Sequence, residues 1–124
     1  MKCENLDIWK KSARISADIY KYFSKCKDFG FKDQITRASL SIPSNIAEGL
    51  ERPTVKDQIK FLYIAQGSAA ELITQIYIGI DIEYIDTKTG KEWIKRLNEV
   101  MPMLHAFISK LQTTDYPQQT NPKD

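Results

Sequence analysis

Few side chains in this 124-residue sequence have the chemistry of a catalytic or metal-binding group. His105 is the one histidine, so a zinc site held by a pair of imidazoles is excluded. The cysteines Cys3 and Cys26 form no C-x-x-C pair, and a Cys–His nucleophile would need Cys26, His105 and an orienting third group to meet. We therefore expect no catalytic residue, no metal and no cofactor, and we interpret His105 as a hydrogen-bonded structural side chain.

One short run has the residue types of a phosphate-binding loop. Lys88-Thr89-Gly90-Lys91 lacks the G-x-x-x-x-G-K-[ST] spacing, and no strand pattern precedes it. We interpret it as a linker and the start of a helix. The sequence also lacks G-x-S-x-G, H-E-x-x-H and the closely spaced carboxylates of a di-metal bundle site. These absences favour a non-enzymatic protein.

Basic side chains recur on one side of the first helical segment. Lys10, Arg14, Lys21 and Lys25 fall within about 60° of one another around a helix. Such a strip is either a solvated face or, repeated around an oligomer, a set of phosphate contacts that add up. No aromatic residue is interleaved in it, which argues against sequence-specific reading of single strands. Arg52, Lys56 and Lys60 form a second, weaker basic cluster.

One carboxylate falls on an apolar arc. Glu71 projects among Ile64, Ile78 and Ile82, and a buried carboxylate needs a partner or a proton. We expect a buried polar network that fixes helix register or a subunit contact, and the alternative is a binding pocket or a catalytic carboxylate. The network is predicted to comprise Arg37, Ser41, Asn45, Glu48, Glu71 and Gln75, with Ser44 as a further donor.

Helical periodicity extends over most of the chain and predicts an all-α, antiparallel up-down four-helix bundle. Apolar residues recur at spacings of three and four over residues 6–25, 31–51, 55–82 and 89–111, with residues 83–90 as a polar linker. Thr54 is expected to cap the third helix. Pro43 and Pro102 fall inside helices and are expected to kink them. Residues 1–111 form the predicted bundle domain, and residues 112–124 the predicted disordered tail.

Composition indicates an ordinary globular protein. Apolar residues make up 42% of the chain, and the net charge is only +2. Residues 1–40 carry nine basic and five acidic side chains, whereas residues 61–90 carry one and four. No apolar stretch is long enough to span a membrane, and the first residues lack the apolar region of a signal peptide. We expect a cytoplasmic protein with no membrane partner.

The apolar arcs of the first, third and last helices are wider than one four-helix core requires. Large exposed apolar patches are rare on monomeric proteins. We therefore expect the chain to associate with copies of itself.

Two blocks and the opening of the chain carry a likeness to a known family. Residues 34–49 read QITRASLSIPSNIAEG, residues 61–75 read FLYIAQGSAAELITQ, and Leu6-x-x-Trp9 opens the first helix. Together they resemble the 23S rRNA intervening-sequence protein family, over about residues 6–111. Thr36 stands where the family often has a second arginine.

The resemblance implies a four-helix bundle that assembles as a homopentamer, with no established enzymatic activity. It extends more distantly to the accessory protein of diversity-generating retroelements, a basic pentamer that works with a reverse transcriptase and nucleic acid. This chain lacks that degree of positive charge.

Two functions of different classes follow. The first is a bacterial accessory protein that binds RNA or DNA phosphates without base specificity, through Lys10, Arg14, Lys21 and Lys25. The second is a protein–protein scaffold whose bundle surface or pore holds a partner polypeptide. The first predicts binding that weakens steeply with salt, and the second predicts binding that survives it.

Overall fold

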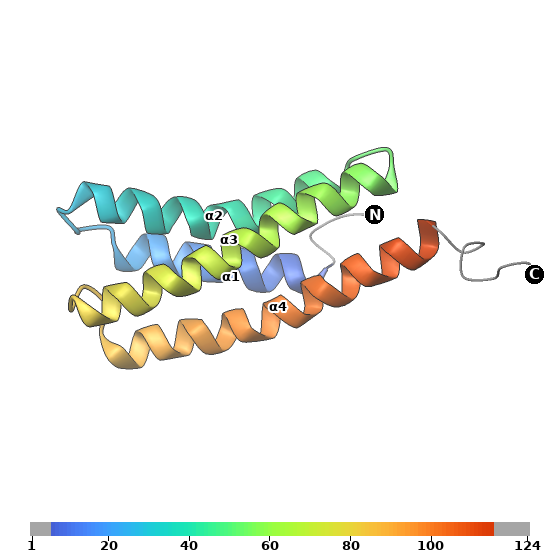
Figure 1. Ribbon diagram of the computed structural model, residues 1–124. Coiled ribbons are helices and arrows are strands. Elements are labelled where there is room, and N and C mark those ends of the chain that lie inside the picture. The colour runs from blue at the N-terminus through green and yellow to red at the C-terminus, as the bar shows by residue number, and fades with distance from the viewer. Residues whose placement is uncertain (1–5, 116–124) are drawn as a thin grey trace, which may run out of the picture.

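A computed structural model describes residues 6–115 as four helices: α1 (Asp7–Tyr22), α2 (Phe29–Leu50), α3 (Val55–Asp81) and α4 (Thr87–Asp115). Successive helices run in opposite directions (Figure 1). Residues 6–115 contain no strand, and the all-α four-helix bundle expected from the periodicity is confirmed. None of the helices in this part of the chain is both long and apolar enough to cross a membrane.

The core lies between helices that are neighbours in the chain. The pairs α1–α2, α2–α3 and α3–α4 pack together, and α1 also packs against α4 to close the group of four. One side of α3 is fully buried between α2 and α4, where Leu62, Leu72 and Ile76 have no exposed surface. Gly49 lets the end of α2 approach α3, because an added Cβ would lie only 3.1 Å from the carbonyl oxygen of Gln58.

Side-chain caps begin three of the helices. Asp28 accepts from the Phe31 N–H at the start of α2, and Thr54 accepts from the Asp57 N–H at the start of α3, as the sequence predicted. Asp86 accepts from the Lys88 and Thr89 N–H groups. The Lys88–Lys91 run is therefore the first turn of a capped helix.

The helix ends correct several sequence-based boundaries. α1 ends at Tyr22, so Lys25 lies in the turn that follows the helix. α4 begins at Thr87 and runs to Asp115, so residues 112–115 are helical where the sequence predicted a disordered tail. Residues 116–124 of that predicted tail lie outside the described residues. Both α2 and α4 continue through their prolines, and the expected kinks stay predictions.

Two turns meet at one end of the bundle. The Tyr84 hydroxyl, after α3, donates to Asp28 in the turn before α2 at 2.8 Å. The Asp86 N–H donates to the Tyr22 hydroxyl at 2.9 Å. The Tyr84 ring also makes an edge contact with Phe31. These contacts tie the α1–α2 turn to the α3–α4 turn.

The α3–α4 turn contains one residue with a left-handed backbone. Glu83 has φ 66°, its N–H donates to the Ile80 carbonyl, and the Tyr84 N–H donates to the Gly79 carbonyl. This pair of bonds is the Schellman arrangement, in which glycine is favoured at the left-handed position. Glutamate carries a steric cost there that glycine does not.

We expect Glu83→Gly to raise the free energy of unfolding by about 1 kcal/mol, because glycine adopts the left-handed conformation without a Cβ clash. Urea denaturation measures the change. The matched control is Glu92→Gly, at an exposed site inside α4, which should lower stability by about 1 kcal/mol. Equal destabilisation by both substitutions would contradict the assignment of strain to Glu83.

Hydrogen bonds from the Phe31 N–H and the Tyr84 hydroxyl hold the pKa of Asp28 below its ordinary value. The stability that Asp28 contributes is therefore present above the ordinary carboxyl pKa and is lost as pH falls through the lowered folded value. In Tyr84→Phe we expect the Asp28 pKa, followed by NMR, to rise toward the ordinary value. Tyr77→Phe, which removes an exposed hydroxyl elsewhere, is the control and should leave that pKa unchanged.

Candidate nucleic-acid interface

The basic strip of α1 faces outward. Lys10, Arg14 and Lys21 are exposed along one side of the helix, and Lys25 is exposed in the turn after it. Within residues 6–115, none of these four cations forms an ion pair. Because no carboxylate of the described chain contacts these cations, all four are available to an anionic ligand. The structure therefore brings three of the four predicted cations onto one helical face and places the fourth beyond its end.

The strip borders a hollow between α1 and α4. Four cations line it, and the two carboxylates beside them leave a net positive charge. Lys11 pairs with Glu99 at 3.9 Å, and Arg96 pairs with Asp18 at 2.9 Å. Lys11 and Arg96 were not predicted from the sequence, because their position beside the strip depends on α4 packing against α1. The lining residues are Asp7, Lys10, Lys11, Arg14, Arg96 and Glu99.

An aromatic residue does lie beside the strip. The half-buried Trp9 lines a second shallow hollow together with Lys10 and Arg14. The ring is held at the α1–α2 side, so it borders the cations without separating them. The face consequently has charge along its length and aromatic surface at one edge.

The second basic cluster is less available. The Arg52 guanidinium lies 4.8 Å from the centre of the Phe61 ring and pairs with Glu48 at 3.4 Å. Lys56 and Lys60 are exposed. Because Arg52 is held by a ring and a carboxylate, this cluster offers two unpaired charges in the described part of the chain.

Part of the predicted polar network joins α2 to α3. The Ser41 and Ser68 hydroxyls share a hydrogen bond of 2.8 Å, and the Asn45 amide donates to both the carbonyl and the hydroxyl of Ser41. Ser68 was missed as a partner, since its small hydroxyl stands within a run of small residues. A second hydroxyl pair, Ser16 with Ser39 at 3.0 Å, is buried between α1 and α2 and was also missed.

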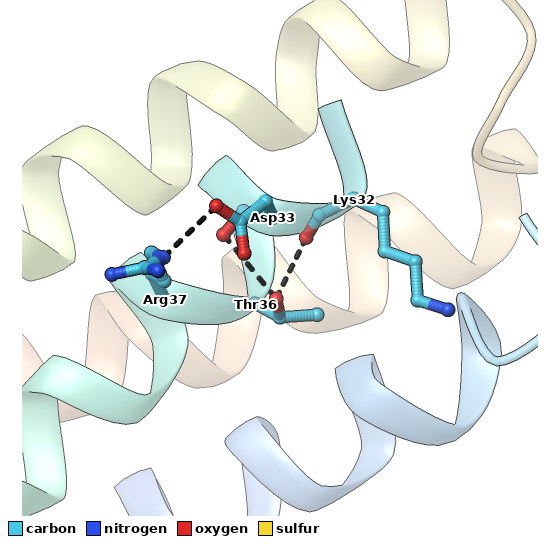
Figure 2. Close-up of polar contacts among 4 residues, drawn as sticks. All are labelled: Lys32, Asp33, Thr36 and Arg37. Carbon is cyan, nitrogen blue, oxygen red and sulfur yellow. Dashed lines mark hydrogen bonds and ion pairs between the residues drawn. The ribbon is translucent and has the colours of Figure 1, made fainter. Parts of the chain in front are cut away.

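Two charged members of the predicted network have local partners instead. Arg37 Nε donates to the Asp33 carboxylate at 3.0 Å on the exposed side of α2, while Thr36 donates to the Lys32 carbonyl within the helix (Figure 2). Glu48 pairs with Arg52. Asp33 lies on α2 itself, whereas Arg52 lies just after the end of α2 and over the Phe61 ring of α3, and in the described chain neither pair joins the Ser41–Ser68 contact.

Glu71 is not buried within the single chain, and its alternative place in a subunit contact stays a prediction. Glu71 is exposed and has no ion pair or hydrogen bond within the described chain. Ile64, Ile78 and Ile82 around it are exposed too, because this side of α3 faces outward from the core. Gln75 is half-buried, and its Oε1 lies buried without a hydrogen-bond partner among residues 6–115. His105 is likewise exposed, contrary to its expected structural role.

The described residues contain no group of three His, Cys, Asp or Glu side chains close enough to hold a metal ion.

Comparison with protein families identifies the group to which the sequence belongs. The model of the 23S rRNA-intervening sequence protein family matches residues 4–106, most of the chain. The chain belongs to this family. The resemblance inferred from its two sequence blocks is thereby confirmed.

A solved structure is similar to most of this intervening-sequence protein. It is a crystal structure of a protein of unknown function from the S23 ribosomal protein family of Bacteroides thetaiotaomicron, 28% identical, with a TM-score of 0.76. The match covers 82% of this chain and 97% of the other. Neither description names an enzymatic activity. Comparison with curated proteins found no match.

The hydrogen bond between Ser41 and Ser68 should contribute about 1 kcal/mol to stability. We expect a double-mutant cycle of Ser41→Ala and Ser68→Ala, measured by urea denaturation, to give a coupling energy of about 0.5–1.5 kcal/mol. Ser44→Ala, on the exposed side of α2, replaces Ser41→Ala in the control cycle and should give no coupling. Additive effects of the Ser41 and Ser68 substitutions would contradict the contact.

Proposed function

We propose that this protein is a non-enzymatic accessory protein of the bacterial cytoplasm that assembles as a homopentamer and binds RNA or DNA without base specificity. The observation that supports the proposal is the exposed strip of cations formed by Lys10, Arg14 and Lys21, with Lys25 beyond it, none of which has an ion pair within residues 6–115. The ligand is the phosphate backbone, which every nucleic acid presents regardless of sequence.

Self-association would make the modest positive charge of one chain sufficient for binding to a nucleic acid. The net charge of one chain is only +2, too small for strong attraction to a polyanion. Copies of the strip arranged around an oligomer contact one nucleic acid at several points, and each neutralised phosphate releases a counterion. Affinity then depends on the number of strips engaged.

Apolar surface outside the core supports the oligomer. Leu40, Tyr63, Ile78 and other large apolar side chains are exposed on the described part of the bundle. Large exposed apolar patches are rare on monomeric proteins, and contact between copies would cover these side chains on α1, α2 and α3.

A protein–protein scaffold is the second candidate. The observation that favours it is the apolar groove between α1 and α2, which a helix or an extended segment of another polypeptide would fit. Binding through such a groove depends on apolar contact and would survive moderate salt. Salt dependence therefore separates the two functions.

We expect the purified, nucleic-acid-free protein to bind unrelated RNA and duplex DNA with similar affinities that fall steeply with salt. In Lys10→Gln/Arg14→Gln/Lys25→Gln, the slope of log K against log salt should decrease by about 0.9 for each duplex phosphate that the variant no longer neutralises. Fluorescence anisotropy across a salt series measures both slopes, with the particle mass followed by light scattering. Lys21 is left unchanged because it also borders the apolar groove.

The control is Lys91→Gln/Lys95→Gln/Lys110→Gln, which removes the same charge from exposed positions on α4. It should change the slope much less than the α1 variant. Equal effects of the two triple variants would contradict the assignment to α1. Absence of binding at low salt by a well-formed oligomer would instead favour the scaffold.

A further inference from the structure

Two apolar surfaces of the bundle have no partner within the described chain. One is a groove between α1 and α2, which we call the α1/α2 groove. It is lined mainly by Trp9, Ala13, Ala17, Leu40, Pro43 and Ala47. The other is the outward side of α3, which we call the α3 face. It consists of Ile64, Gly67, Glu71, Ile78 and Ile82.

The α1/α2 groove is hollow because its floor is made of small residues. Alanines on both helices leave a concave space of about 590 Å³. Leu40, 48% exposed, and Tyr20, 41% exposed, border this space. Lys21 also lines it and has no carboxylate partner within residues 6–115. The groove therefore suits an apolar ridge that carries a negative charge.

The α3 face is such a ridge. Ile64, Ile78 and Ile82 are 43%, 48% and 46% exposed, and their spacing places them on one side of the helix over about 27 Å. Glu71 stands among them, exposed and unpaired in the described chain. An added Cβ on Gly67 would meet nothing within 4 Å, so another backbone has room to approach there.

We infer that the α3 face of one copy of this chain docks in the α1/α2 groove of the next copy, with Glu71 opposite Lys21. The inference rests on the proposed self-association and specifies which surfaces make it. Charge selects the pairing: two α3 faces would bring two Glu71 carboxylates together, and two grooves would bring two Lys21 ammonium groups together. A groove with an α3 face brings opposite charges together and covers both apolar surfaces.

This contact joins different surfaces, so it is head-to-tail, and every copy carries one of each. α3 packs beside α2 but is not among the main partners of α1, which places the groove and the α3 face on different sides of the bundle. Head-to-tail contacts of this kind form a ring when the rotation between copies closes. Lys10 and Arg14 border the groove beside Trp9 without lining it, and they also line the hollow toward α4, where phosphate can reach them while Lys21 faces Glu71.

The test blocks each surface separately. Leu40→Asp puts a carboxylate in the apolar lining of the groove, and Ile78→Lys puts an ammonium group among the isoleucines of the α3 face, so each substitution would bury an unpaired charge in the contact. Both positions are about half exposed, so the bundle should keep its helical circular dichroism. We expect each variant alone to have the mass of one chain, 14.3 kDa, by sedimentation equilibrium. Phe29→Gln, at an exposed apolar residue outside both surfaces, should keep the parent mass.

Mixing the two variants identifies the pairing. The Leu40→Asp chain keeps an intact α3 face, and the Ile78→Lys chain keeps an intact groove, so an equimolar mixture should form 1:1 dimers that cannot grow. Ala17→Arg and Gly67→Arg are a second pair that blocks the same surfaces, and Gly67→Arg extends into open space. Either pair alone is sufficient for the test.

Three results would overturn the inference. A Leu40→Asp chain that still dimerises would show that α3 faces pair with each other. Variants that keep the parent's mass would show that other surfaces hold the oligomer together. A parent chain that stays at 14.3 kDa would overturn both the interface and the proposed self-association. Nucleic-acid binding by the parent is measured separately, so its absence together with 1:1 dimers would overturn only the nucleic-acid function.

Discussion

The burial of one side of α3 between α2 and α4 is the constraint on which the rest of the structure depends. Leu62, Leu72 and Ile76 are fully enclosed there, and each buried side chain of this size contributes about 1.5–3 kcal/mol. α2 and α4 must both lie close to α3 for that burial. Gly49 permits the approach of α2, and the capped turn through Glu83 returns the chain so that α4 packs alongside.

That constraint also determines which side chains remain outside the hydrophobic core. Only one side of a helix can pack against a single core. Because one side of α3 is buried there, the isoleucines around Glu71 face outward. On α1 the same partition leaves Lys10, Arg14 and Lys21 outside, beside a groove whose apolar floor no other helix in the described chain covers. The surfaces proposed for nucleic acid and for a second copy are therefore products of one packing arrangement.

The sequence predicted the helices well because periodicity and caps are local properties. The 3–4 spacing of apolar residues and the Thr54 cap specify α3 almost to the residue. The rotation of each helix about its own axis was harder to predict, because a helix that is apolar over more than half of its circumference has a pattern that does not say which part faces the core. Glu71 was placed inside for that reason. Ser68 was missed because a partner across two helices depends on register, and Arg96 because its place beside α1 depends on tertiary packing.

Native mass spectrometry of the full chain over a wide concentration range tests the central claim most directly, that the apolar surface left outside the core is covered by further copies in a closed ring. We predict one species, several times the 14.3 kDa of a single chain, whose mass does not increase with concentration. A mass of 14.3 kDa throughout would contradict self-association. A series of masses that lengthens with concentration would contradict closure of the ring.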